Sequence, residues 1–95
     1  MAQERVLDVS MLEPPEPLER ALDAVETLRA GEYLRMIFPR EPHPLFTLLE
    51  QYGVEFLSDP TPDMRWEVRA WLQGDTEAAR AAHASVPGSA GPATH

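Results

Sequence analysis

The stretch Met11–Leu22, MLEPPEPLERAL, decides how the rest of the chain is interpreted. Pro14, Pro15 and Pro17 stand at the start of a run in which apolar residues recur every three or four positions. Proline is favoured in the first turn of a helix, because the N–H groups there have no intrahelical partner. The stretch therefore predicts the start of an amphipathic helix over residues 15–29.

The segments around this helix predict strands and one further helix. Arg5–Val9 and Glu32–Phe38 have the composition and alternation of strands. A helix over His43–Tyr52, a short strand over Val54–Ser58 and an alternating strand over Met64–Leu72 complete the order β-α-β-α-β-β. The first strand–helix–strand unit predicts a parallel pair, and the short turn before the last strand predicts an antiparallel pair. The expected fold is α+β, a two-layer sandwich with two helices on one face of a four-stranded mixed sheet.

Length and composition set the domain boundaries. The chain has 95 residues, which suits one small domain, and we assign residues 1–72 to it. Residues 73–95 are rich in Ala, Pro and Gly and are expected to be mostly disordered, with at most a helical turn or two over Asp75–Ala84. No long apolar run and no leader pattern is present, so we expect a cytoplasmic protein.

Charge and cysteine content exclude several classes of function. The net charge is −8, and all eight basic residues are Arg. Such a charge repels phosphate backbones and anionic headgroups, so we expect neither nucleic acid nor membrane as a partner. The chain has no Cys, which excludes disulfides, thiolate nucleophiles, persulfide carriage and Cys-ligated metals.

One candidate site lies where both predicted helices begin. If the first two strands are parallel, residues 10–17 and 39–44 meet at one sheet edge, where helix N-termini attract anions. We expect this edge to bind a small anion or a partner's carboxylate, although capping of the two helices alone also explains these residue types. The candidate residues are Glu13, Pro14, Glu16, Arg40, Glu41 and His43.

Metal binding and catalysis have weak support in the sequence. His43 with Glu41 and either Asp8 or Glu13 could offer ligands, but no HxH, HxxxH or HExxH spacing occurs. We therefore predict no metal and no cofactor. No nucleophile–base pair is visible either, so we do not expect an enzyme.

A second candidate site is the sheet face that two helices would leave open. Tyr, Trp and Arg anchor many interfaces, so this face is expected to bind a protein partner or a second copy of the chain. An ordinary solvated face, or a tail that folds back over it, explains the same residues. The candidate residues are Tyr33, Arg35, Ile37, Leu57, Arg69 and Trp71, with Arg65 and Glu67 beside them.

Three segments carry a family resemblance: LDVSMLEPPEPLERAL, AGEYLRMIF and EPHPLFTLLEQYG. The element order and the Pro-x-Pro helix start resemble the TusA/SirA sulfur-carrier fold, and Pro14 stands where the carrier Cys would be. Over residues 5–72 the chain is similar to a bacterial family, domain of unknown function 2249. Arg40 takes the place of a His that members often carry, and His43 comes three residues later.

The resemblance implies a non-enzymatic interaction or accessory module, sometimes fused to hemerythrin-like domains or encoded beside nitrogen-oxide respiration genes. Because proline has no nucleophile, persulfide transfer is not expected. The alternative is a small-anion or metal-binding sensor domain that uses the two helix N-termini.

Overall fold

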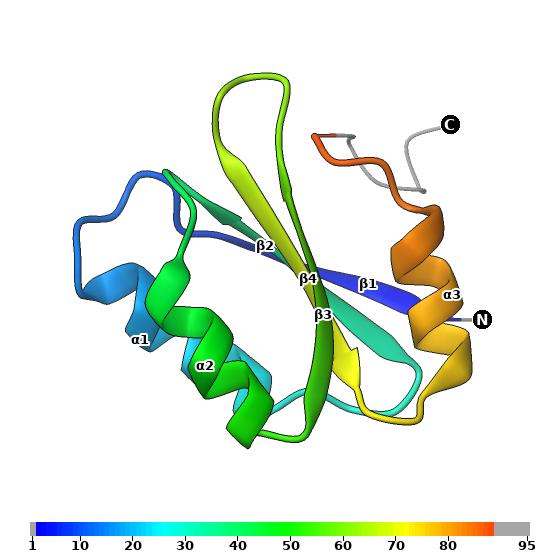
Figure 1. Ribbon diagram of the computed structural model, residues 1–95. Helices are drawn as coiled ribbons and strands as arrows, with labels where there is room; N and C mark the ends of the chain where they lie inside the picture. The colour runs from blue at the N-terminus through cyan, green and yellow to red at the C-terminus, as the bar shows by residue number, and fades with distance from the viewer. Residues whose placement is uncertain (1, 89–95) are drawn as a thin grey trace.

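The computed structural model describes residues 2–88 (Figure 1). Four strands form one sheet in the order β1-β2-β4-β3, with helices on both of its faces. Within the described residues, no helix has the length and apolarity needed to cross a membrane. The elements are β1 (Gln3–Asp8), α1 (Glu16–Glu26), β2 (Glu32–Phe38), α2 (His43–Gln51), β3 (Val54–Pro60), β4 (Trp66–Leu72) and α3 (Thr76–Ala84).

The strand pairing confirms the predicted α+β mixed sheet. Strands β1 and β2 are parallel, as the strand–helix–strand unit requires. Strand β4 pairs antiparallel with both β2 and β3. Because β1 and β2 run the same way, α1 and α2 both begin near the carboxyl ends of the strands that precede them.

Helices α1 and α2 cover one face of the sheet with large apolar side chains. On β2, Leu34, Met36 and Phe38 point to this face, and Leu45 and Leu49 of α2 pack over them with no exposed surface. Helix α1 ends earlier than predicted, at Glu26, because the N–H of Thr27 turns back to the carbonyl of Ala24. The alternation in the sequence therefore predicted this layer well, and the differences are confined to the ends of helices and strands.

The opposite face differs from the prediction of an open sheet and a mostly disordered tail from residue 73. Helix α3 packs on this face against β2 and β4 (Figure 1). Ala78 and Ala82 are fully buried against Tyr33 and Trp71. The small alanine side chains let the helix approach the two rings closely. Most of the apolar area buried in this contact therefore belongs to the sheet. For this reason the sequence of the tail shows only a weak hydrophobic pattern. Residues 89–95 of the predicted tail lie outside the described part of the chain.

The start of α3 is fixed by Asp75. Its carboxylate accepts hydrogen bonds from the backbone N–H of Ala78 (3.2 Å) and of Gly31 (2.8 Å). These bonds keep the pKa of Asp75 below its ordinary value of 3.8. Gly74, with φ of +87°, makes the turn that leads into this cap. The cap thus joins α3 to the turn before β2.

Candidate functional site

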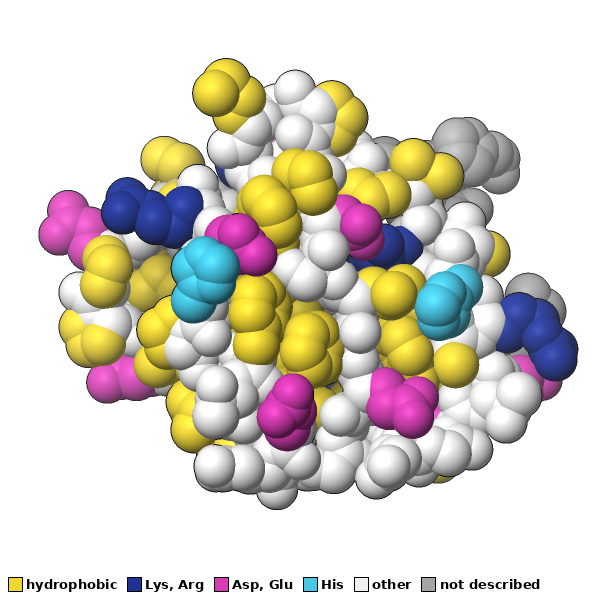
Figure 2. All heavy atoms as spheres, viewed as in Figure 1, with side chains coloured by type: hydrophobic (Ala, Val, Ile, Leu, Met, Phe, Trp, Pro, Cys, Tyr) yellow, Lys and Arg dark blue, Asp and Glu magenta, His cyan; other side chains and the backbone are white. Residues whose placement is uncertain are grey.

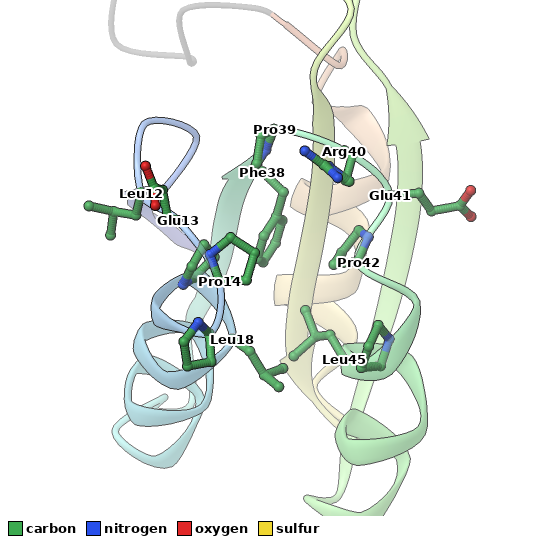
Figure 3. Close-up of a pocket in the computed structure, with 13 residues that line it drawn as sticks. Leu12, Glu13, Pro14, Leu18, Phe38, Pro39, Arg40, Glu41, Pro42 and Leu45 are labelled. Atoms are coloured by element: carbon green, nitrogen blue, oxygen red, sulfur yellow. The ribbon is translucent and has the colours of Figure 1, made fainter.

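A pocket of about 390 Å³ lies between the starts of α1 and α2, and we call it the proline pocket (Figure 3). Pockets that hold small ligands begin near this size. The structure brings residues 12–18 and residues 38–45 together here. The lining residues are Leu12, Glu13, Pro14, Pro15, Pro17, Leu18, Phe38, Pro39, Arg40, Glu41, Pro42, Pro44 and Leu45.

Two equivalent helix starts build the pocket. Pro15–Leu18 and Pro42–Leu45 share the pattern Pro-x-Pro-Leu, with the second proline at the second position of each helix. Leu18 and Leu45 are directed toward each other, and the ring of Phe38 lies above them (Figure 3). Phe38 is 2% exposed and Leu45 is fully buried. Leu18, Leu45 and Phe38 form the apolar wall of the pocket. The repeated Pro-x-Pro-Leu pattern is the sequence signal that could have predicted the two leucines of this wall. A single proline-rich helix start does not carry that information.

The helix starts offer few hydrogen-bond donors to a ligand. The second residue of each helix, Pro17 or Pro44, has no backbone N–H. The N–H of Glu16 donates to the carbonyl of Glu13, and that of His43 donates to the carbonyl of Glu41. The N–H of Leu45 is also used, by the carbonyl of Pro42. An anion held in the usual way needs free N–H groups at a helix N-terminus, so the geometry favours an apolar ligand group inside the pocket.

The charged side chains of the predicted site lie at the rim or beside it. Glu13, Arg40 and Glu41 line the pocket, whereas Glu16 and His43 do not. The carboxylate of Glu41 turns away from the pocket (Figure 3) and lies 3.4 Å from Nε2 of His43. Within residues 2–88, the guanidinium of Arg40 has no ion pair. The rim therefore carries Glu13, Arg40 and Glu41 around an apolar interior.

No metal centre is formed by the described residues. Within residues 2–88, no group of three or more His, Asp or Glu side chains could hold a metal ion. Asp8, one candidate ligand, accepts hydrogen bonds from the hydroxyl (2.6 Å) and the N–H of Ser10, which lower its pKa. Its other oxygen lies 3.6 Å from the guanidinium of Arg65. Asp8 is thus occupied by protein groups.

The predicted partner face is buried beneath α3. Tyr33, Arg35, Ile37, Arg69 and Trp71 are at most 8% exposed, and Leu57 is half-buried. A partner could reach the five buried side chains only if α3 and the segment that follows it moved away. The sequence signal for α3 was Asp75 followed by Glu77, a common helix start. The signal was weak because the alanine-rich sequence after it offers few large apolar side chains.

Beneath α3 the two central strands carry a buried charge network. Arg35 donates to Glu4 and to Glu67, each at 3.2 Å. The hydroxyl of Tyr33 donates to Glu4 at 2.6 Å. Burial, followed by this hydrogen bond to Glu4, raises the pKa of Tyr33 to about 12. Each buried guanidinium or carboxylate therefore has an opposite charge within reach, as buried charges require.

A second buried guanidinium, that of Arg69, holds the end of α3. Arg69 donates to the carbonyl of Ala82 at 2.7 Å and to that of Ser85. Its other terminal nitrogen donates to Asp59 at 2.6 Å. A cation at the carboxyl end of a helix is stabilised by the helix dipole. Arg69 therefore anchors α3 to the sheet and does not face solvent.

A smaller apolar surface lies over α2 and β3. Phe46 and Phe56 stack at 5.3 Å between ring centres, and His43 meets Phe46 edge-on at 6.1 Å. In Figure 2, hydrophobic side chains gather over α2 and β3 in this view, with separate carboxylates among them.

Comparisons with known proteins give a family and no closer relative. No curated protein and no solved structure matches the chain. The family described as "Uncharacterized conserved protein (DUF2249)" matches residues 6–71, which run from the second half of β1 to the penultimate residue of β4 and include both helix starts of the proline pocket. The chain belongs to this family.

Proposed function

We propose that the protein is a non-enzymatic accessory module that recognises a protein partner through the proline pocket. The observation that carries the proposal is an apolar pocket of about 390 Å³ whose helix starts have lost or used most of their N–H donors. Such a pocket suits an apolar side chain better than a free anion.

The sulfur-carrier-like fold is part of this proposal. The mixed sheet, with α1 and α2 starting at one edge, is compatible with the resemblance read from the sequence. At Pro14, where carriers of that fold keep a cysteine, the pocket has an apolar ring. Because the chain has no Cys, the module would bind at this edge without transferring sulfur.

Binding of a partner or a second copy on the α3 face has less support. Trp71 is 3% exposed there, and its indole N–H donates to Glu55 at 3.1 Å. A partner on this face would have to displace α3 and break the contacts of Arg69. The proline pocket needs no such rearrangement.

A small-anion sensor is the second candidate function. Arg40 favours it, because its guanidinium lies at the rim and has no ion pair within residues 2–88. Free N–H groups aimed at the ligand would strengthen this candidate. Pro17 and Pro44 lower the number of such groups, because proline has no backbone N–H. A metal-binding sensor gains no support from the described residues.

A pocket-filling variant tests the leading proposal. Pro44 lines the pocket and is exposed, so Pro44→Trp should fill it without disturbing the core. The control is Gln51→Trp, at an exposed position at the other end of α2. The uncharged probe 3-phenylpropan-1-ol should shift the amide resonances of Leu18 and Leu45 in the wild type and in Gln51→Trp, but not in Pro44→Trp.

The same pair of variants tests partner recognition in cells. Proteins cross-linked to the wild type and to Gln51→Trp should be missing from Pro44→Trp. If the probe leaves the Leu18 and Leu45 resonances of the wild type unchanged at millimolar concentration, the pocket is not a binding site and the proposal fails.

A further inference from the structure

The surface beside the proline pocket is strongly acidic. Helices α1 and α2 together carry five carboxylates and one guanidinium, a net charge of −4. They thus hold half of the chain's net charge of −8, and the two helices border the pocket on both sides. A partner that binds here meets this negative field first.

The carboxylates of α1 lie on one side of the helix. At 3.6 residues per turn, Glu16, Glu19, Asp23 and Glu26 fall within an arc of about 80°, and the rise from first to last is about 15 Å. All four side chains are exposed. We call this set the carboxylate column; it begins next to Pro15 and Pro17 of the pocket and runs away from it along α1.

Three of the four carboxylates in the column have no ion pair within residues 2–88. Glu16 pairs with Arg20 at 3.1 Å, four residues along the exposed helix, and Glu26 accepts a long hydrogen bond of 3.4 Å from Tyr52. Within residues 2–88, Glu19 and Asp23 make no ion pair. The contact between Glu26 and Tyr52, the residue directly after α2, places the far end of the column beside α2.

From these observations we infer that the partner of the proline pocket is a cationic protein segment. It places one apolar side chain in the pocket and Lys or Arg side chains along the carboxylate column. The pocket supplies burial of apolar area, and the column supplies charge complementarity, which speeds and orients the encounter. The inference rests on the proposed function, because it assigns a chemistry to the occupant of the same pocket.

Three probes with one skeleton separate the roles of pocket and charge. 3-Phenylpropylammonium, 3-phenylpropan-1-ol and 3-phenylpropanoate differ in their charge, and each is titrated against the isotope-labelled full chain at low and at high salt. The ammonium probe should bind about threefold more tightly than the carboxylate at low salt. The difference should shrink at high salt, and the ammonium probe should also shift the amide of Glu19.

Matched variants locate the charge effect. Glu19→Gln and Glu77→Gln each remove one exposed carboxylate from the first turn of a helix, α1 or α3. The advantage of the ammonium probe over the alcohol should fall in Glu19→Gln and stay unchanged in Glu77→Gln. In Arg40→Gln, ammonium binding should be equal or tighter.

The outcomes distinguish this inference from the proposed function. If the alcohol binds in the pocket but the carboxylate binds as tightly as the ammonium, or if Arg40→Gln abolishes binding of the ammonium, the cationic partner is overturned and the pocket remains a site. If none of the three probes shifts the Leu18 and Leu45 resonances, both proposals fail.

Discussion

The two faces of the sheet are covered in opposite ways. Under α1 and α2, leucines, Met36 and Phe38 pack into an apolar core with no charged side chain among its members. Under α3, the helix contributes little more than alanines, and the sheet contributes two buried guanidinium groups, Arg35 and Arg69, each with its own partners. The first face gains stability from the burial of apolar area. The stability of the second face depends on each buried charge having its oppositely charged partner in the correct place.

Because of this difference, a mutation on one face should change the free energy of unfolding for a different reason than a mutation on the other. Shortening an apolar side chain leaves a cavity whose cost depends on how well its surroundings relax. Removing one member of a buried charge network leaves another charge without a partner, which costs more for the same number of atoms. The predictions below test that contrast, starting with the largest expected effect.

Arg35→Met should be the most damaging single change. It leaves Glu4 and Glu67 without their shared cation, and we expect a loss of about 4 kcal/mol in the free energy of unfolding, measured by urea denaturation. The control Arg20→Met removes an exposed pair with Glu16 and should cost less than about 0.5 kcal/mol. Equal losses in the two variants would show that the α3 face does not depend on its charges.

Leu49→Ala should cost about 3 kcal/mol, because Leu49 is fully buried beneath α2 and the cavity would be closed on all sides. Leu48→Ala, at the half-buried neighbouring position of the same helix, should cost clearly less. Urea denaturation of both variants measures the difference. A larger loss for Leu48→Ala would contradict the assignment of the core face.

Ala82→Leu should loosen α3 while the rest of the fold stays intact. Ala82 is fully buried, and overpacking of this kind costs about 1 to 3 kcal/mol. Faster hydrogen exchange of the α3 amides and a weaker near-ultraviolet signal from Trp71 would report the loosening. Ala84→Leu, at an exposed position of the same helix, should change neither measurement.

High pH should weaken the α3 face through Tyr33. Its pKa is raised from 10.0 to about 12, so its contribution to stability is complete below pH 10 and is lost as the pH rises through 12. Unfolding followed over this range should show a decline that Tyr33→Phe lacks. An identical decline in both proteins would assign the effect to other groups.

Low pH should weaken the start of α3 through Asp75, the smallest effect of the series. The pKa of this carboxyl is lowered by the N–H groups of Gly31 and Ala78. Its contribution is therefore present above its ordinary value of 3.8 and is lost as the pH falls below it. Asp75→Asn keeps a capping side chain and should show a flatter dependence of α3 hydrogen exchange on acid pH.

The sequence predicted the apolar face better than the charged one, for a physical reason. The alternation of Leu34, Met36 and Phe38 against Tyr33, Arg35 and Ile37 assigned the residues of β2 to the two faces. The alternation could not show that the second face is covered. Helix α3 has a capping residue and small alanine side chains but no apolar stripe of large residues, so its sequence does not indicate that it packs on the sheet. The partners of Arg35, Glu4 and Glu67, lie on two other strands, and only the register brings them together.

The candidate edge was predicted in part. The parallel pair β1 and β2 brings both helix starts together, as the element order implied, and Glu13, Pro14, Arg40 and Glu41 line one pocket. Its apolar wall was not predicted, because Leu18, Phe38 and Leu45 lie on three different elements, α1, β2 and α2. Leu18 and Leu45 hold the same place in the repeated Pro-x-Pro-Leu pattern, whereas Phe38 is the last residue of β2.

The strand order leaves β1 and β3 as the two open edges of the sheet. Edges of this kind invite strands from other copies of a chain, which leads to aggregation. Charged residues occupy half of β1 (Glu4, Arg5 and Asp8), while β3 ends in Asp59 and Pro60, the latter without an N–H to donate. Both edges thus discourage strand addition, and the sheet should remain four-stranded even in concentrated solution.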